Sequence, residues 1–139
     1  MGVFITSPIG NSSPLTKFAR DATVQSVTAD TTLATLAVSA ASCTQYILIL
    51  VDCDTTATGA AGTGGANVLV DIGVTNRFNQ PVANYILSAD GNIKVGATAL
   101  FYYEPSAAEK SAGFNVVIKC DVGAATSTFN YRSATVMGY

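Results

Sequence analysis

The sequence contains no histidine among its 139 residues. Because histidine is the usual base and a common metal ligand of hydrolases, its absence excludes every His-dependent nucleophile and His-containing zinc site. Charged residues are also scarce, at 12% of the chain, about half the usual share for a soluble domain. The surface must therefore be covered by Thr, Ser, Asn, Gly and Ala. Such a surface can pack against another protein without burying an ion, which favours permanent association.

Basic residues are few and scattered, and the net charge is -2. Binding to a phosphate backbone needs a concentrated basic patch, so we expect no nucleic-acid partner. The longest apolar run, Tyr46 to Val51, is far shorter than the roughly 20 residues that cross a bilayer. Residues 1–7 have neither the basic start nor the apolar stretch of a secretion signal. We therefore expect that the protein does not associate with membranes. We also expect that it is made in the cytoplasm.

The three cysteines, an odd number, suit a reducing compartment. Cys43 and Cys53 flank one predicted strand, whose ten residues would hold them about 33 Å apart. A disulfide needs Cα atoms within about 7 Å, so these two cannot pair. Cys120 shares the parity of Phe114, Val116 and Ile118 and is predicted to be a small buried apolar residue.

Alternation of apolar and polar residues with period two recurs along the chain, and no long stretch has helical spacing. It is clearest at residues 92–104, where only Leu100 is out of place. Asp90-Gly91 suits a two-residue turn, which predicts a hairpin of 84–89 with 92–104. A second hairpin is predicted between 113–122 and 126–137. Further strands are predicted at 23–29, 32–39, 45–53 and 67–75.

About eight short strands predict an all-β fold, an antiparallel β-sandwich or jelly roll, with one short helical turn near 106–112. Ser106 and Glu109 have the spacing of a capping box there. The middle of the strand at 45–53 is apolar on both faces, which predicts a central strand covered on both sides.

Residues 1–22 are predicted to be an extended N-terminal arm, and residues 23–139 a single β-sandwich domain. Pro8 and Pro14 interrupt the arm and restrict pairing in a central strand. An alternative is that residues 3–6 form the first strand of the sandwich. We expect the arm to contribute more to partner binding than to folding. Its candidate partner-binding residues are Val3, Phe4, Ile5, Leu15 and Phe18.

Three motifs invite a chemical interpretation and fall short of it. Asp52 and Asp54 could form the carboxylate pair of a glycosidase, but acidic residues are also common beside turns. The segment starting at Asp52 begins like a calcium loop, yet Ala57 and Thr63 stand where that loop needs Gly and Glu. The glycine-rich segment 59–65 lacks the Lys-Ser/Thr pair of a phosphate-binding loop and is predicted to be a loop tip. We therefore predict no catalytic, cofactor-binding or metal residues, no cofactor and no enzymatic activity.

The low charge, the abundance of small residues, the all-β pattern and the arm together resemble bacteriophage virion structural proteins, and among these most nearly capsid decoration (cement) proteins. The resemblance is one of overall character along the whole chain. It implies a homo-oligomer, often a trimer, that clamps subunits of the major capsid protein and stabilises the phage head. It also implies a protein made in the host cytoplasm and located in the virion.

Other classes share parts of this character. A phage tail, neck or receptor-binding component would have the same composition and would show exposed aromatic grooves. A coat protein that wraps RNA would be small and β-rich, but the basic face it needs is missing. A small carbohydrate-binding module or glycosidase would need a cleft that holds Asp52 and a second acid.

Overall fold

The computed structural model describes residues 15–139 except 44, 58–61, 74–75, 88–92 and 123–126. Nine strands and one short helix form in this part of the chain. In chain order the elements are β1 (Thr16–Asp21), β2 (Gln25–Val27), β3 (Thr31–Val38), β4 (Ile47–Ala57), β5 (Gly62–Ile72), β6 (Asn76–Leu87), β7 (Ile93–Tyr103), α1 (Ala107–Ala112), β8 (Phe114–Val122) and β9 (Ser127–Gly138).

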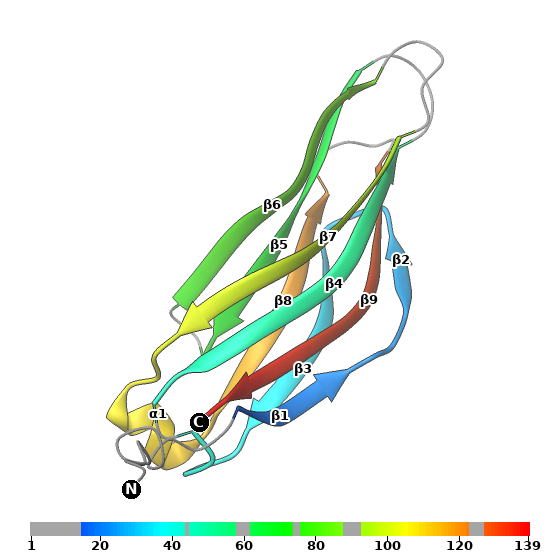
Figure 1. Ribbon diagram of the computed structural model, residues 1–139. Helices are drawn as coiled ribbons and strands as arrows, with labels where there is room; N and C mark the ends of the chain where they lie inside the picture. The colour runs from blue at the N-terminus through cyan, green and yellow to red at the C-terminus, as the bar shows by residue number, and fades with distance from the viewer. Residues whose placement is uncertain (1–14, 44, 58–61, 74–75, 88–92, 123–126) are drawn as a thin grey trace, which may run out of the picture.

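The strands form two antiparallel sheets that face each other (Figure 1). Sheet A has the order β1-β9-β4-β7, and β2 also pairs with β9, along the same edge as β1. Sheet B has the order β3-β8-β5-β6. Counted from β2, the two orders are 2-9-4-7 and 3-8-5-6, the arrangement of an eight-stranded jelly roll. The predicted all-β sandwich is therefore confirmed.

Both predicted hairpins are wrong, although the strands themselves are present. β6 pairs with β5 in sheet B while β7 pairs with β4 in sheet A, and β8 and β9 are likewise in opposite sheets. Residues 90–91, the predicted turn, lie outside the described residues. Alternation shows which side chains face the core but not which strand lies alongside. The hairpin that does form in sheet B joins β5 to β6.

Among the strand boundaries, those of β5 and β6 differ most from the prediction. The glycine-rich segment was predicted to be a loop tip, but residues 62–65 belong to β5 and pair with β6. β6 begins at Asn76, eight residues before the predicted strand, and its register with β5 shifts beside Pro81. Proline lacks the backbone N–H of a sheet ladder and is tolerated in an edge strand or at a bulge, both of which apply here.

The proposed boundary between arm and domain at residue 22 is also wrong. Residues 16–21 form β1, which pairs with β9 from Gly138 to Ala134. They therefore belong to the sandwich, and a truncation starting at Asp21 would remove a strand of sheet A. The extra residue at the β-bulge in β1 is Phe18, which packs against the core. A bulge breaks the period-two pattern, which explains why the sequence showed no strand there.

The core lies between the two sheets. Sheet A contributes alternate residues of β4 and β9, and sheet B those of β3, β5 and β8. The largest fully buried side chains are Tyr131, Phe129, Ile47, Ile49, Ile72 and Ile118. The buried hydroxyl of Tyr131 donates a hydrogen bond to Asp21 Oδ2 at 2.9 Å, which fastens the end of β1 to β9.

The helical turn predicted near 106–112 is confirmed as α1. The Ser106 hydroxyl accepts a bond from Glu109 N at 3.3 Å, and Glu109 Oε2 accepts one from Ser106 N at 2.7 Å, which completes a capping box. The Tyr103 hydroxyl donates to the same carboxylate at 2.9 Å and so ties the helix to β7. Within the described residues no helix has the length and apolar character needed to span a membrane.

All three cysteines are buried and none forms a disulfide, as predicted for the pair Cys43 and Cys53. Burial, assisted by the neighbouring carboxylates of Asp52 and Asp54, raises the pKa of the Cys53 thiol to about 12. Burial also raises the pKa of Cys43 and of Cys120. Because the thiolate is the reactive form, a thiol reagent at pH 8 should label none of them in the native protein and all three after unfolding in urea. Rapid labelling of the native protein would contradict this packing.

Candidate functional site

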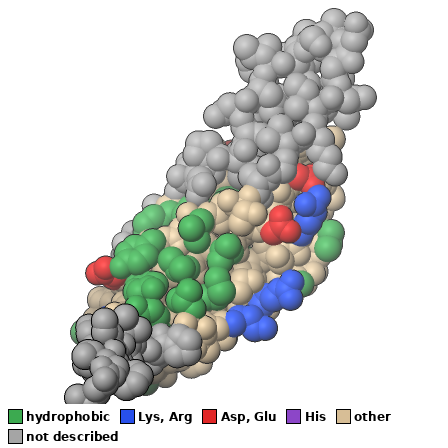
Figure 2. Space-filling model, viewed as in Figure 1, with side chains coloured by type: hydrophobic (Ala, Val, Ile, Leu, Met, Phe, Trp, Pro, Cys, Tyr) green, Lys and Arg blue, Asp and Glu red, His purple; other side chains and the backbone are tan. Residues whose placement is uncertain are grey.

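The two sheets present outer faces of different character. On sheet B, where the side chains are described, the Lys119 ammonium and the Asp71 carboxylate form an ion pair at 2.5 Å, Thr32 and Thr35 are exposed, and the half-buried Leu69 and Val117 lie beside this pair. On sheet A, hydrophobic side chains gather over β7, β4 and β9, with Lys and Arg side chains along the β1 edge (Figure 2). The outer face of sheet A is therefore the candidate functional surface.

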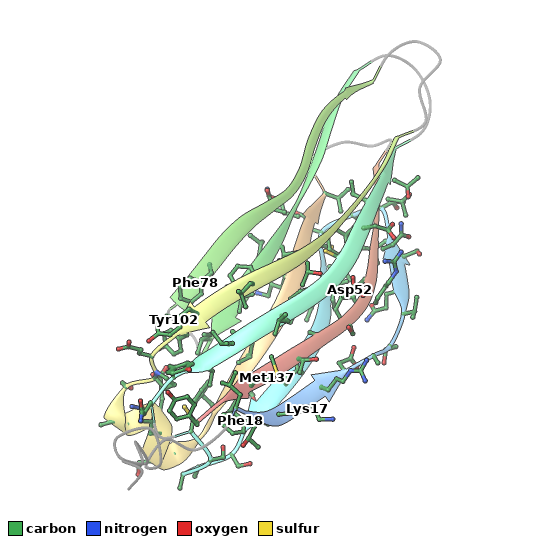
Figure 3. All side chains as sticks on the ribbon, in the orientation of Figure 1. Lys17, Phe18, Asp52, Phe78, Tyr102 and Met137 are labelled. Atoms are coloured by element: carbon green, nitrogen blue, oxygen red, sulfur yellow. The ribbon has the colours of Figure 1, made fainter. Side chains whose placement is uncertain are left out.

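Register places the side chains of this face in rows across the sheet, because directly paired residues project to the same side. The first row consists of Lys17, Met137, Leu48 and Tyr102, on β1, β9, β4 and β7 respectively. The second row consists of Arg20, Thr135, Leu50 and Leu100 on the same four strands. Figure 3 shows the labelled Lys17, Met137 and Tyr102 following one another along the first row. Each row runs from a basic residue to an apolar or aromatic one.

The apolar side chains of the two rows are open to solvent. Leu100 is 54% exposed and Tyr102 52% exposed, while Leu48 and Leu50 are half-buried. The strand at 45–53 was predicted to be central and covered on both sides. β4 is indeed central, between β9 and β7, but no described element covers its outer side. An apolar run in the sequence cannot distinguish a second covering layer within the chain from a surface left for a partner.

Three tyrosines close one end of this face. The ring of Tyr46 lies 5.3 Å from that of Tyr102 and 4.8 Å from that of Tyr139, centroid to centroid. Tyr102 donates a hydrogen bond to Glu104, which raises the pKa of the phenol to about 12. Beside the rings is a shallow pocket of about 300 Å³, which Gln45 and Lys110 also line. The cluster combines flat apolar surface with hydrogen-bonding groups, a combination common at binding surfaces.

Asp52 and Asp54, the carboxylate pair considered as a catalytic or calcium site, have neither the open cleft nor the loop that such a site needs. Asp52 and Asp54 lie within β4, paired on both sides with β7 and β9, so they are not in a loop. Asp54 is only 1% exposed; it accepts a hydrogen bond from Asn130 Nδ2 at 2.6 Å and one from the Arg132 guanidinium. The register shift between Asp52 and Cys53 brings Arg132 over both acids, with Nη1 3.9 Å from Asp52 Oδ1.

This arrangement is that of a structural ion cluster. A glycosidase carboxylate must reach a substrate, whereas that of Asp54 is covered and bonded to two neighbours. No group of three or more potential ligands among the described Cys, Asp and Glu side chains could hold a metal ion.

The structure describes two of the five predicted partner-binding residues, and their environments differ. Leu15 is 50% exposed just before β1, whereas Phe18 is half-buried against the core. Val3, Phe4 and Ile5 lie outside the described residues. Two features of the sequence pointed to the outer face of sheet A. One was Leu100, which is out of place on the polar side of its strand, and the other was the apolar run in β4.

The chain is similar to parts of larger solved structures. One is infectious bursal disease virus, Gx strain, at 16% identity over 90% of this chain and 31% of that chain, with a TM-score of 0.38. The T13 particle of the same virus matches at 11% identity over 91% and 31%, with a TM-score of 0.37. The CBM22-1–GH10 modules of Clostridium thermocellum xylanase 10B, complexed with xylohexaose, match at 12% identity over 88% and 28%, with a TM-score of 0.32.

The chain thus spans about a third of the length of the solved chains it matches. No protein-family profile and no curated protein matches the sequence. All three TM-scores are below 0.5, too low to indicate a shared function.

Proposed function

We propose that the protein is a non-enzymatic structural component of a virion that works by binding other protein chains. The observation that carries the proposal is the open apolar face of sheet A on a jelly-roll fold. Jelly rolls occur in viral capsid and lectin domains, so the fold is compatible with this role without establishing it. An exposed apolar patch bordered by polar residues marks an interaction surface. The surface elsewhere is poor in charge, which suits permanent contact.

Within this class we propose a capsid decoration protein, made in the host cytoplasm, that forms a homo-oligomer and stabilises a phage head by clamping major capsid protein subunits. The apolar rows of sheet A would supply contact area to a neighbouring chain. Mass spectrometry of purified virions tests the role, because copy number separates an abundant shell protein from a rare tail component. Absence from the particle would contradict the proposal.

The contribution of this face to protein binding can be tested with Leu100→Lys. Leu100 is 54% exposed, so the lysine should leave the melting temperature nearly unchanged. At the centre of an interface it would bury a charge, and we expect binding to particles that lack the protein to weaken by about tenfold or more. Co-sedimentation measures the effect. Thr35→Lys, on the outer face of sheet B, is the matched control and should bind normally.

A carbohydrate-binding role, as in a receptor-binding tail component or a small module, is the second candidate. The open tyrosine cluster of Tyr46, Tyr102 and Tyr139 favours it, because sugar rings stack on exposed aromatic faces and the adjoining pocket offers polar groups. Titration with soluble glycans, followed by tyrosine fluorescence, distinguishes this role from protein binding.

A further inference from the structure

We propose that two copies of the chain pack face to face through the outer face of sheet A, about a two-fold axis that runs parallel to the strands between β9 and β4. The inference rests on the proposed function in that it takes this face to be a protein-binding surface. It adds the partner, a second copy of the chain that occupies this face, and the geometry of the contact; in the dimer, Leu100→Lys would weaken particle binding by weakening the contact between the two copies.

The order of side chains along the first row is what identifies the partner. Lys17 stands at one end of the row, and Tyr102, bonded to Glu104, stands at the other. Met137 and Leu48 occupy the middle. The row thus has a cationic end, an apolar middle, and an aromatic end beside an anion.

A two-fold axis in the plane of the interface and parallel to the strands reverses this row in the second copy. Each β1 then faces the partner copy's β7, and each β9 faces β4. Lys17 comes to lie over the Tyr102 ring and Glu104 carboxylate of the second copy, where both a cation–π contact and an ion pair are available. Met137 packs on Leu48 of the second copy, and the contact forms twice.

The other in-plane axis, perpendicular to the strands, gives a poorer match. It places β1 over β1 and β7 over β7, so that Lys17 and Arg20 of the two copies approach each other. Like charges brought together at an interface oppose association. The charge order across the sheet therefore selects the axis that runs along the strands.

The second row fits the same axis. Arg20 would lie over Leu100 of the second copy, where its aliphatic stem can cover the exposed leucine while the guanidinium reaches the rim. Thr135 would face Leu50. Lys110, on α1, lines the same pocket as Tyr102 and Glu104, so Lys17 of the second copy would approach this cation as well as the Glu104 carboxylate. Twisted sheets that pack face to face typically cross at about 30°.

Sedimentation equilibrium measures the assembly, and charge reversal tests its geometry. The wild-type protein should have twice the 14.2 kDa of one chain at micromolar concentration. Lys17→Glu and Glu104→Lys should each raise the dimer dissociation constant about tenfold or more, since each places like charges together. The double variant should recover most of the affinity. Thr35→Glu, on the outer face of sheet B, adds a negative charge away from the contact and should dimerise like the wild type.

Mixed cross-linking gives a second test that needs no loss of binding. Leu48→Cys and Met137→Cys, made in separate chains and mixed under oxidising conditions, should form the heterodisulfide in preference to either homodisulfide. The native cysteines are buried and should not compete. A preferred Leu48→Cys homodisulfide would overturn the proposed axis, because it would place β4 over β4.

A wild-type mass of one chain or of three would overturn the proposal, as would a double charge variant no better than the single ones. A mass of three would instead agree with the trimer that the resemblance implies. A monomer that still binds particles and loses that binding with Leu100→Lys would leave the proposed function standing. A dimer that is absent from purified virions would uphold the dimer and contradict the virion role.

Discussion

Replacement of Arg132 by alanine is expected to lower the free energy of unfolding by about 2–3 kcal/mol. The guanidinium is the cationic partner of Asp54, whose carboxylate is 1% exposed in the middle of sheet A. Removing the cation leaves a buried anion with weaker compensation from Asn130. The estimate is below the full cost of breaking a buried pair because Arg132 itself is half exposed and water can partly replace it. Urea denaturation measures the change.

Asp54→Asn provides the matched control for this prediction. In the Arg132→Ala background it removes the buried charge that has lost its cationic partner, so the double variant should be more stable than Arg132→Ala alone. Arg132→Lys keeps the charge and should lose less stability. A loss below about 0.5 kcal/mol for Arg132→Ala would show that the ion cluster contributes little to the fold.

Gly138→Ala is the second substitution for which we expect a large effect. A Cβ at this position would lie 2.1 Å from the Tyr46 carbonyl oxygen and 2.9 Å from Ile47 Cα. Both are backbone atoms, so β4 and β9 would have to separate locally at a cost of about 2–3 kcal/mol. Thermal unfolding measures this loss of stability.

The separation would also displace Tyr46, and we therefore expect Gly138→Ala to weaken binding through the outer face of sheet A. Met137→Ala is the neighbouring control for stability, since its half-buried side chain lies on the outer face of sheet A and alanine keeps a Cβ that the wild-type residue already has. If Gly138→Ala melts like the wild type, the close approach of the two strands at this end is wrong.

Alternation in the sequence was sufficient to place most strands, and the capping box placed α1. The neighbours of each strand could not be predicted from it. The strands 84–89 and 92–104 have complementary patterns and a good turn sequence between them, yet β6 and β7 lie in opposite sheets. The alternation of side chains shows which of them are buried. This pattern is the same whether the next strand pairs in a hairpin or crosses to the other sheet. β1 was not predicted because the β-bulge at Phe18 interrupts the alternation in this strand.

The candidate site was visible in the sequence only as anomalies. Leu100 appeared as an irregularity in an otherwise regular strand, and the apolar run in β4 was read as a strand buried on both sides. Register is what turns these residues into one surface, because it aligns Leu100 with Leu50 and Tyr102 with Leu48 across β7 and β4. Register depends on pairing between strands some 50 residues apart, which a local pattern does not contain.

The position of β9 has a consequence for the order in which the molecule forms. β9 lies between β1 and β4 in sheet A, yet it follows every other described strand in the sequence. Sheet A therefore cannot close until residues 127–138 have left the ribosome, and its pairings join segments far apart in the chain, which slows folding. Neither row of the open face exists before that moment, since Met137 and Thr135 belong to the last strand. A growing chain thus lacks the complete outer face of sheet A, so the proposed association through that face can begin only after β9 has been made.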